Sequence, residues 1–258
     1  MLRTFDDDAG NRVTVTDPTT SVVSLVPSLT ESIAVTAPNL VVGATDWCTH
    51  PSTLDVARIG GTKNPRVDDI VALGADVVIA NDEENRDADI AALRAAGQPV
   101  WVTAPRTLPG ALASLDRMLR LACGLRRPDW LDAATAAWQA QYSGPRRRAA
   151  VLIWRRPWMA IGRDTFAGDL LARLGVDNVL GESTKRYPRV DLAELRDRRP
   201  DLIVLPDEPY AFSRSDGPEA FAGWGVPVAC VSGRQLTWYG PSLVDARAIL
   251  TRQLAESR

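Results

Sequence analysis

The sequence has one histidine, three cysteines and no long apolar run among its 258 residues. Cys48, Cys123 and Cys230 are widely spaced and form no Cys-x-x-Cys pair, which argues against a disulfide framework or a structural zinc site. No apolar run approaches the roughly 20 residues that a membrane-spanning helix needs. Thirty basic and thirty-two acidic residues leave a net charge of −2, so the overall charge does not favour nucleic acid as a partner.

Catalytic motifs are also missing. The sequence has no Gly-x-Ser-x-Gly nucleophile elbow, no phosphate-binding loop and no glycine-rich dinucleotide fingerprint. Any Cys-His or Ser-His-Asp device would have to use His50, with Cys48 two residues away. In an extended segment this spacing turns both side chains to the same side. The support for nucleophilic catalysis is thin, and we expect that the chain is not an enzyme.

Residues 1–15 lack a basic start, an apolar stretch and a small-residue cleavage site. They predict a chain that stays in the cytoplasm. A chain from which an export signal has been removed would begin in the same way, so an extracytoplasmic, periplasmic-type location is the alternative.

One phrase is present twice. Pro65-Arg66-Val67-Asp68 precedes an apolar run at 77–80, and Pro188-Arg189-Val190-Asp191 precedes one at 202–205. Two copies more than a hundred residues apart predict paired domains rather than a solenoid. Two α/β lobes that face each other form a cleft, which is where ligands bind.

Short apolar runs alternate with helical patterns on both sides of this repeat, as in mostly parallel, buried sheets with helices on their faces. The fold class predicted is α/β, with two Rossmann-like lobes bridged by one long rigid helix at 128–142. Pro and Asp begin this helix and Gly-Pro ends it. The predicted strands are 22–25, 41–44, 77–80, 100–103, 149–153, 202–205 and 228–231, and the other predicted helices are 30–37, 88–96, 108–123 and 241–254. The predicted domains are 1–106, with a hairpin at 4–15 on its edge, a helical segment 107–145, and 146–258.

Ligands of open α/β sheets bind beyond the carboxyl ends of the strands. The segments that fall there are rich in aromatic and charged residues, and flat aromatic surfaces suit a large planar ligand. The candidate ligand-binding residues are Trp47, His50, Glu83, Glu84, Trp154, Arg155, Arg156, Trp158, Arg186, Tyr187, Trp238 and Tyr239. Each tryptophan has packing beneath its loop as an alternative role.

His50 is the one candidate for direct metal ligation or proton transfer. A histidine that precedes a proline is more often a turn residue with a satisfied hydrogen bond. Asp82, Glu83 and Glu84 offer carboxylates for a hard cation, but consecutive acids in a loop are usually solvated or cap the next helix.

Several segments together resemble the cobalamin and iron-siderophore substrate-binding proteins of ABC importers. Within that superfamily the chain is most similar to the helical-backbone metal receptors, or class III periplasmic binding proteins. The segments that carry the resemblance are Ser21-Val22-Val23-Ser24-Leu25-Val26-Pro27-Ser28-Leu29-Thr30-Glu31, Cys48-Thr49-His50-Pro51, Gly60-Gly61-Thr62-Lys63-Asn64-Pro65, Ala80-Asn81-Asp82-Glu83-Glu84-Asn85, Arg186-Tyr187-Pro188 and Trp238-Tyr239-Gly240.

The resemblance implies two α/β lobes joined by a rigid helix, with the ligand held between the lobes by aromatic side chains. By position, Trp47, Trp154, Trp158 and Tyr187 match the aromatic residues of the cobalamin-binding relatives. Thr62 and Asn81 replace two further aromatics, which is a departure from the cobalamin pattern. The resemblance also implies that Asp68 and Asp191 dock on arginines of a membrane permease, although aspartates at such sites also cap helices.

The leading hypothesis is a monomeric, non-enzymatic protein that binds a metal chelate, such as a cobalamin-like corrinoid, haem or a ferric siderophore, for ABC-type uptake. Arg155, Arg156, Lys185 or Arg186 would meet acidic or amide groups of the chelate. The ligand is cargo, and no catalytic cofactor is expected. The alternative is a cytosolic metal-dependent enzyme, or a metallocofactor chaperone or sensor, centred on His50. A partner-docking protein with a degenerate ligand site is a third possibility.

Overall fold

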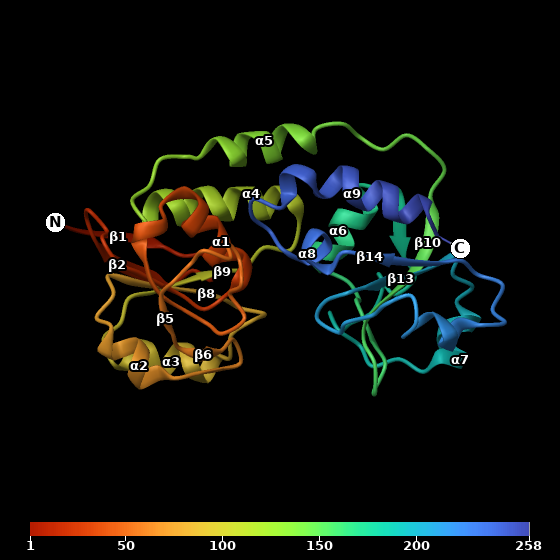
Figure 1. Cartoon of the computed structure of the whole chain (residues 1–258), viewed down its shortest axis with the longest axis horizontal. Helices are drawn as coiled ribbons and strands as arrows, with labels where there is room; N and C mark the ends of the chain where they lie inside the picture. The colour runs from red at the N-terminus through yellow and green to blue at the C-terminus, as the bar shows by residue number, and fades with distance from the viewer. Residues whose placement is uncertain (258) are drawn as a thin grey trace. The chain divides into compact units, whose positions relative to one another are not determined.

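In the computed structural model, which describes residues 1–257, the alternating runs form two separate α/β units. The first consists of residues 1–105, 109–132 and 239–241, and the second of residues 106–108, 133–238 and 242 onward. No helix of the described residues is long and apolar enough to cross a membrane. The predicted α/β class with mostly parallel sheets is therefore confirmed (Figure 1).

The first unit contains a five-stranded, all-parallel sheet in the order β5-β4-β3-β8-β9. The strands are continuous apolar runs because both faces of the sheet are covered by helices. In Figure 1, α4 lies on the opposite side of this sheet from α2 and α3. The elements are β3 (Val22–Ser24), α1 (Pro27–Thr36), η1 (Pro38–Leu40), β4 (Val41–Ala44), β5 (Ala57–Arg58), β6 (Gly60–Gly61), β7 (Asn64–Pro65), α2 (Val67–Ala72), β8 (Val77–Asn81), α3 (Asp87–Ala95), β9 (Val100–Thr103), α4 (Leu108–Arg117) and the π-helical η2 (Met118–Ala122).

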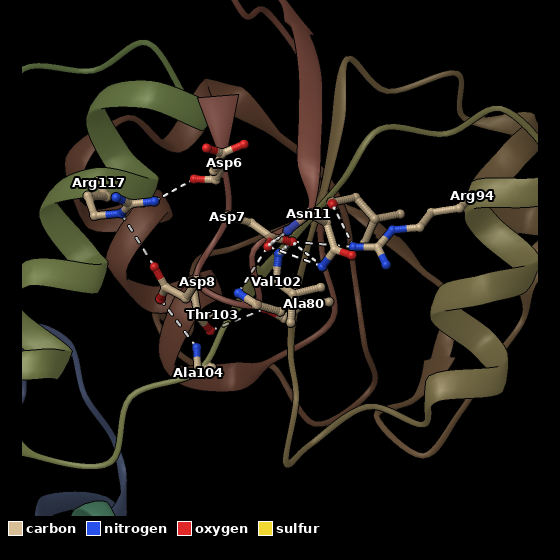
Figure 2. A network of polar contacts seen from close by, with 12 residues as sticks. Asp6, Asp7, Asp8, Asn11, Ala80, Arg94, Val102, Thr103, Ala104 and Arg117 are labelled. Atoms are coloured by element: carbon tan, nitrogen blue, oxygen red, sulfur yellow. Dashed lines mark hydrogen bonds and ion pairs between the residues drawn. The ribbon is translucent and has the colours of Figure 1, made fainter. Parts of the chain in front are cut away.

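The predicted N-terminal hairpin is formed by β1 (Leu2–Asp6) and β2 (Arg12–Thr16). Its turn lies against β9, which is the edge strand of the sheet. Asp7 Oδ2 accepts a hydrogen bond from the Val102 amide at 3.2 Å, and the Asp8 amide donates to the Val102 carbonyl at 3.1 Å (Figure 2). Arg94 and Arg117 form ion pairs with Asp7 and Asp8. The hairpin therefore covers the open edge of the sheet, as expected.

The second unit repeats the plan around β10, β13 and β14, which are parallel. The short β11 and β12 pair with opposite ends of β10, and β14 is an edge strand. A buried cluster that includes Leu195, Ile203, Phe212 and Phe221 fills one face of this sheet, and α9 packs beside β14. The elements are β10 (Arg147–Trp154), β11 (Met159–Ala160), α6 (Phe166–Ala172), β12 (Val176–Asn178), α7 (Leu192–Asp197), β13 (Leu202–Pro206), η3 (Pro218–Phe221), β14 (Val228–Val231), α8 (Gly233–Thr237) and α9 (Leu243–Ala255).

The helix predicted at 128–142 is shorter than expected. It is α5 (Asp129–Ala137), a helix of nine residues. After Ala137 the chain turns, and the indole N–H of Trp138 donates to the Leu243 carbonyl at 2.9 Å. That contact places a bulky side chain against the start of α9 where the helix was expected to continue. The role of this helix as a rigid bridge remains a prediction.

Candidate functional site

The loop after β4 displays Trp47 to solvent. Trp47 has 68% of its surface exposed, whereas its neighbour Cys48 is fully buried. The Cys48 thiol lies 3.0 Å from Thr30 Oγ1 and 3.1 Å from Thr45 Oγ1. Burial raises the pKa of this thiol, and the two hydroxyl contacts only partly oppose that effect. Cys48 is therefore an anchor beneath the loop, and Trp47 is the side chain that the loop presents.

Arg58 on β5 fixes the same loop. Its guanidinium donates to the carbonyls of Thr45 at 3.0 Å, Cys48 at 2.9 Å and Leu54 at 3.1 Å. Hydrogen bonds from a charged donor are stronger than neutral ones, so three of them hold the loop firmly. This role of Arg58 was not predicted from the sequence, because an isolated arginine after a loop gives no local sign of the carbonyls that it will meet.

The two glycines of the Gly-Gly-Thr-Lys-Asn-Pro segment allow the β6–β7 hairpin to pass close to the Trp47 indole. Gly60 has a φ of +89°, and a Cβ there would approach the Asn64 carbonyl oxygen to 3.0 Å. A Cβ on Gly61 would lie 2.4 Å from Asn64 Oδ1 and 3.5 Å from Trp47 Nε1. The tight β6–β7 hairpin needs glycine at both positions. Its backbone forms a surface beside the Trp47 indole.

His50 lies on the exposed side of this loop, and Thr49 Oγ1 is 3.2 Å from its Nδ1. Because Cys48 points into the unit, the expectation that Cys48 and His50 share a side is wrong. Among residues 1–257, no cluster of three or more histidine, cysteine, aspartate or glutamate side chains is placed to hold a metal ion. Direct metal ligation by His50 remains a prediction.

The acidic loop after β8 is organised by two asparagines. Asn81 Oδ1 accepts hydrogen bonds from the amides of Glu83 at 2.9 Å and Glu84 at 3.0 Å. Asn85 Oδ1 accepts from the Asn81 amide at 2.9 Å, and its Nδ2 donates to the Thr62 carbonyl at 3.0 Å. Both asparagines are buried. Their side chains shape the loop, in which Glu84 is exposed and Glu83 is half-buried.

In the second unit, the end of β10 and the turn that follows it carry four candidates that have different environments. Trp154 is 41% exposed, and its ring meets Tyr210 edge to face at 5.8 Å. Trp158 instead stacks on Phe212 at 6.0 Å and meets Phe221 at 5.6 Å, against the buried cluster. Arg156 is exposed and has a φ of +66°. Trp154 and Arg156 are thus displayed, whereas Trp158 has a packing role.

Arg155 is already engaged by carboxylates. Its guanidinium pairs with Asp216 and, at 2.6 Å, with Glu219, and it lies over the Trp158 ring at 5.3 Å. Tyr210 donates to Asp216 at 2.7 Å, and this hydrogen bond raises the pKa of the tyrosine. Asp216 and Glu219 were not predicted, because they follow Arg155 by more than sixty positions. Their charges compete with any anionic group of a ligand for Arg155.

The remaining candidates of the second unit lie in two loops. Tyr187 is 37% exposed, and the Arg186 carbonyl accepts from the Gly162 amide at 2.6 Å. Trp238 donates from its indole to Glu208 at 2.9 Å, and Arg234 lies over its ring at 5.5 Å. These contacts fix Trp238 through its polar edge.

Tyr239 belongs to the first unit and is buried. Its hydroxyl lies 3.3 Å from Thr103 Oγ1, and burial raises its pKa. A buried side chain with this partner suits a structural role, so ligand contact through the Tyr239 ring has no geometric support.

The two candidate docking aspartates are placed differently despite their identical sequence context. Asp191 is the N-cap of α7 and accepts from the amides of Ala193 at 2.7 Å and Glu194 at 3.3 Å. Asp68 is exposed in the first turn of α2, whose N-cap is Arg66. The capping role considered for both residues is therefore seen for Asp191 alone.

Comparison with known proteins identifies the family. Residues 22–223 match the family model described as periplasmic binding protein, and the chain belongs to this family. The vitamin B12-binding protein of Pectobacterium atrosepticum is 23% identical over 254 residues, which covers 91% of this chain and 88% of that protein. The resemblance predicted from the sequence is confirmed. Members of this family are binding proteins for transport, not enzymes.

Two solved structures have the same fold. The periplasmic vitamin B12 binding protein BtuF of Vibrio cholerae matches with a TM-score of 0.73 and 18% identity, over 92% of this chain and 97% of that one. The periplasmic heme-binding protein RhuT from Roseiflexus sp. RS-1 matches with a TM-score of 0.73 and 21% identity, over 92% of this chain and 98% of that one. At these identities the likeness establishes the fold alone.

Proposed function

We propose that the chain is the extracytoplasmic receptor of an ABC-type importer and that it binds a planar metal tetrapyrrole, with cobalamin the first candidate and haem the second. Family membership supports the class of protein. The named relatives bind vitamin B12 or heme, which supports the class of ligand. The expectation of a cytoplasmic location receives no support from a family of periplasmic binding proteins.

The observation that carries the proposal is the display of Trp47. An indole with 68% of its surface in water loses the benefit of burial, yet it stands on a loop fixed by Arg58 and Cys48. A rigid loop pays little conformational entropy when a ligand arrives. Stacking on an aromatic face is the contact that such a residue offers a flat ligand.

The second unit offers complementary groups. Trp154 and Tyr187 are its exposed aromatic candidates, and Arg156 and Lys185 are exposed cations at the same ends of the strands. We propose that Trp154 and Tyr187 contact the macrocycle. Arg156, Lys185 and Arg186 then meet propionate, phosphate or amide groups on its rim, because guanidinium and ammonium groups bind such acceptors strongly.

Docking on a permease is proposed through Asp68 and Asp191. Both carboxylates are exposed at the starts of helices. Charge reversal at both positions is expected to reduce ligand-stimulated ATP hydrolysis by a reconstituted importer while leaving ligand affinity unchanged. Unchanged stimulation would remove the docking role.

The proposal is tested by titration of the purified protein with cyanocobalamin, haemin and a ferric hydroxamate siderophore, with tryptophan quenching and the visible spectrum as readouts. One ligand should quench saturably near one equivalent. Trp47→Ala should weaken its binding about tenfold, while Trp47→Phe, which keeps an aromatic face, should weaken it less. Trp130→Phe is the matched control, because Trp130 belongs to the first unit and its indole is engaged by Thr36.

No quenching by any chelate, together with tight uptake of a bare divalent ion, would refute the proposal and favour the His50-centred alternative. That alternative has lost a ligand, since the Cys48 thiol is turned away from His50 and is held by Thr30 and Thr45.

A further inference from the structure

The edge strands β9 and β14 occupy equivalent positions in the two units. The Val78 amide donates to Pro99 at 2.8 Å and the Asp82 amide to Thr103 at 3.1 Å. In the second unit the Ile203 amide donates to Pro227 at 3.0 Å and the Asp207 amide to Val231 at 3.1 Å. Pro99 therefore corresponds to Pro227, and Val102 corresponds to Cys230. Both strands pair on one side only.

The backbone groups on the outer side of β9, away from β8, have hydrogen-bond partners. Because alternate residues of a strand in a parallel sheet face opposite neighbours, Val100 and Val102 direct their amide and carbonyl groups outward. The Val102 amide donates to Asp7 Oδ2 at 3.2 Å, and the Val102 carbonyl accepts from the Asp8 amide at 3.1 Å. Arg94 donates to the same Asp7 oxygen at 3.3 Å and to the Val100 carbonyl at 3.4 Å (Figure 2). The Asp7 carboxylate is thus held on the sheet by one edge amide and one guanidinium, and its own turn adds donors from Ala9 and Asn11.

The corresponding backbone groups on the outer side of β14 have no hydrogen-bond partner among the described residues. Val228 and Cys230 direct their amide and carbonyl groups outward, and no described residue pairs with that side of the strand. A cavity of about 650 Å³ runs along this edge. Its walls include Phe221 of η3 and Gln253 of α9. Unpaired strand edges recruit extended peptides, since each added residue satisfies backbone groups in the ladder.

The β14 edge also has a nearby arginine, as the β9 edge has Arg94. Arg214 lines the cavity beside Cys230, is exposed, and forms no hydrogen bond or ion pair with the residues that the structure describes. Burial raises the pKa of the Cys230 thiol, and the charge of Arg214 acts in the opposite direction. Arg214 and the Cys230 amide thus offer the same pair of donors as Arg94 and the Val102 amide. Among the described residues of the lining, Arg214 is the basic one and Glu256 the acidic one, so a carboxylate is favoured at Arg214 and disfavoured beside Glu256.

We propose that the edge of β14 is a docking site for an acidic turn or strand of a partner polypeptide, independent of the chelate site. The partner's carboxylate is held by the Cys230 amide and Arg214, and its backbone N–H binds the Cys230 carbonyl. A second copy of this chain is a poorer occupant, because its own acidic turn is already bound to its β9 edge.

The test uses the full-length, ¹⁵N-labelled protein and an acetylated, amidated peptide Phe-Asp-Asp-Asp-Ala-Gly-Asn-Arg, which copies residues 5–12. Amide shifts are followed by nuclear magnetic resonance. The Val228 and Cys230 amides should shift saturably, and Val102 should not, since its partner is present. A control peptide with Asn in place of the aspartate that corresponds to Asp7 should bind at least about tenfold more weakly.

Variants isolate each donor. Arg214→Ala should weaken the acidic peptide about tenfold or more, whereas Arg198→Ala, an exposed arginine of the same unit, should not. Cys230→Pro removes the outward amide without touching the ladder to β13, and Cys230→Ala keeps it. Binding should be lost in the first and retained in the second. If Cys230→Pro does not fold, the loss or retention of peptide binding in Arg214→Ala decides whether the proposal stands.

Three results would overturn the proposal. The first is the absence of shifts at Val228 and Cys230 at millimolar peptide. The second is equal binding of the acidic and control peptides. The third is a change at these amides that depends on protein concentration alone, which would assign the edge to a second copy.

Discussion

Trp47 and Trp158 are both loop tryptophans, and the structure predicts opposite consequences for their removal. Trp158 loses two aromatic partners, Phe212 and Phe221, when it is replaced by alanine. Each such pair contributes about 0.5–1.5 kcal/mol beyond the buried area. With the lost apolar contact and the Arg155 interaction, we expect a destabilisation of about 2–4 kcal/mol, below the upper range for a fully buried tryptophan. Trp47→Ala should cost less than about 0.5 kcal/mol, because the ring is exposed.

The assay is urea unfolding followed by circular dichroism, with the ligand titration run on the same samples. For an m-value of about 2 kcal/mol/M, Trp158→Ala should lower the midpoint of the second unit's transition by about 1–2 M. Two units can unfold separately, so each transition is fitted by itself. Trp47→Ala should leave both midpoints unchanged and weaken ligand binding. Equal midpoints for the two variants would refute the assignment of Trp158 to packing.

Three further outcomes are expected. Arg58→Gln should free the loop that carries Trp47, weaken chelate binding several-fold, and speed the reaction of Cys48 with a thiol reagent. An unchanged rate of thiol reaction would show that the three carbonyl contacts do not hold the loop. Asp191→Ala should destabilise the second unit by about 1 kcal/mol through loss of its N-cap, while Asp68→Ala, the matched control, should have little effect on urea midpoints. Burial acts to raise the pKa of Asp76, but hydrogen bonds from Thr20 and Ser21 lower it below 3.8 overall. The ionised Asp76 therefore stabilises the fold above pH 3.8, and this contribution is lost as the pH falls through the lowered pKa. Asp76→Asn should therefore be less stable than wild type at pH 7, with a gap that narrows in acid; a constant gap from pH 7 to pH 2 would contradict this reasoning.

The sheets were predictable because buried parallel strands are continuous apolar runs. The runs at 41–44 and 100–103 match β4 and β9 residue for residue. The short β5, β6, β7, β11 and β12 were missed, since two or three residues carry no measurable periodicity. These short strands nevertheless place the site: β5 carries Arg58, and β6 and β7 form the surface beside Trp47.

Within the site, residue type alone did not separate displayed tryptophans from packed ones. Arg156 takes a left-handed φ of +66°, which is uncommon for a residue other than glycine. The chain reverses there, and Trp158 returns to the buried cluster while Trp154 stays exposed. Pro157 marks a turn, but no local signal tells which tryptophan packs, because the partners of Trp158, Phe212 and Phe221, lie more than fifty positions further along the chain.

The repeated Pro-Arg-Val-Asp shows how context overrides identical sequence. In the first copy Pro65 pairs with Gly60 in a small hairpin, and the carbonyl of Arg66 accepts the first helical hydrogen bond from Ile70 at 3.1 Å. In the second copy the Pro188 carbonyl accepts from Ala160 at 3.0 Å, and Val190 donates to the Trp158 carbonyl at 3.0 Å, so the chain is still extended there.

The second helix consequently starts two residues later in the phrase. Its first helical hydrogen bond runs from Leu195 to the Asp191 carbonyl at 3.0 Å. The carboxylate of Asp191 is then used for capping, while that of Asp68 extends from the first turn of its helix. The two aspartates match in sequence but differ in their contacts, so a partner that binds both must accommodate one carboxylate that caps a helix and one that does not.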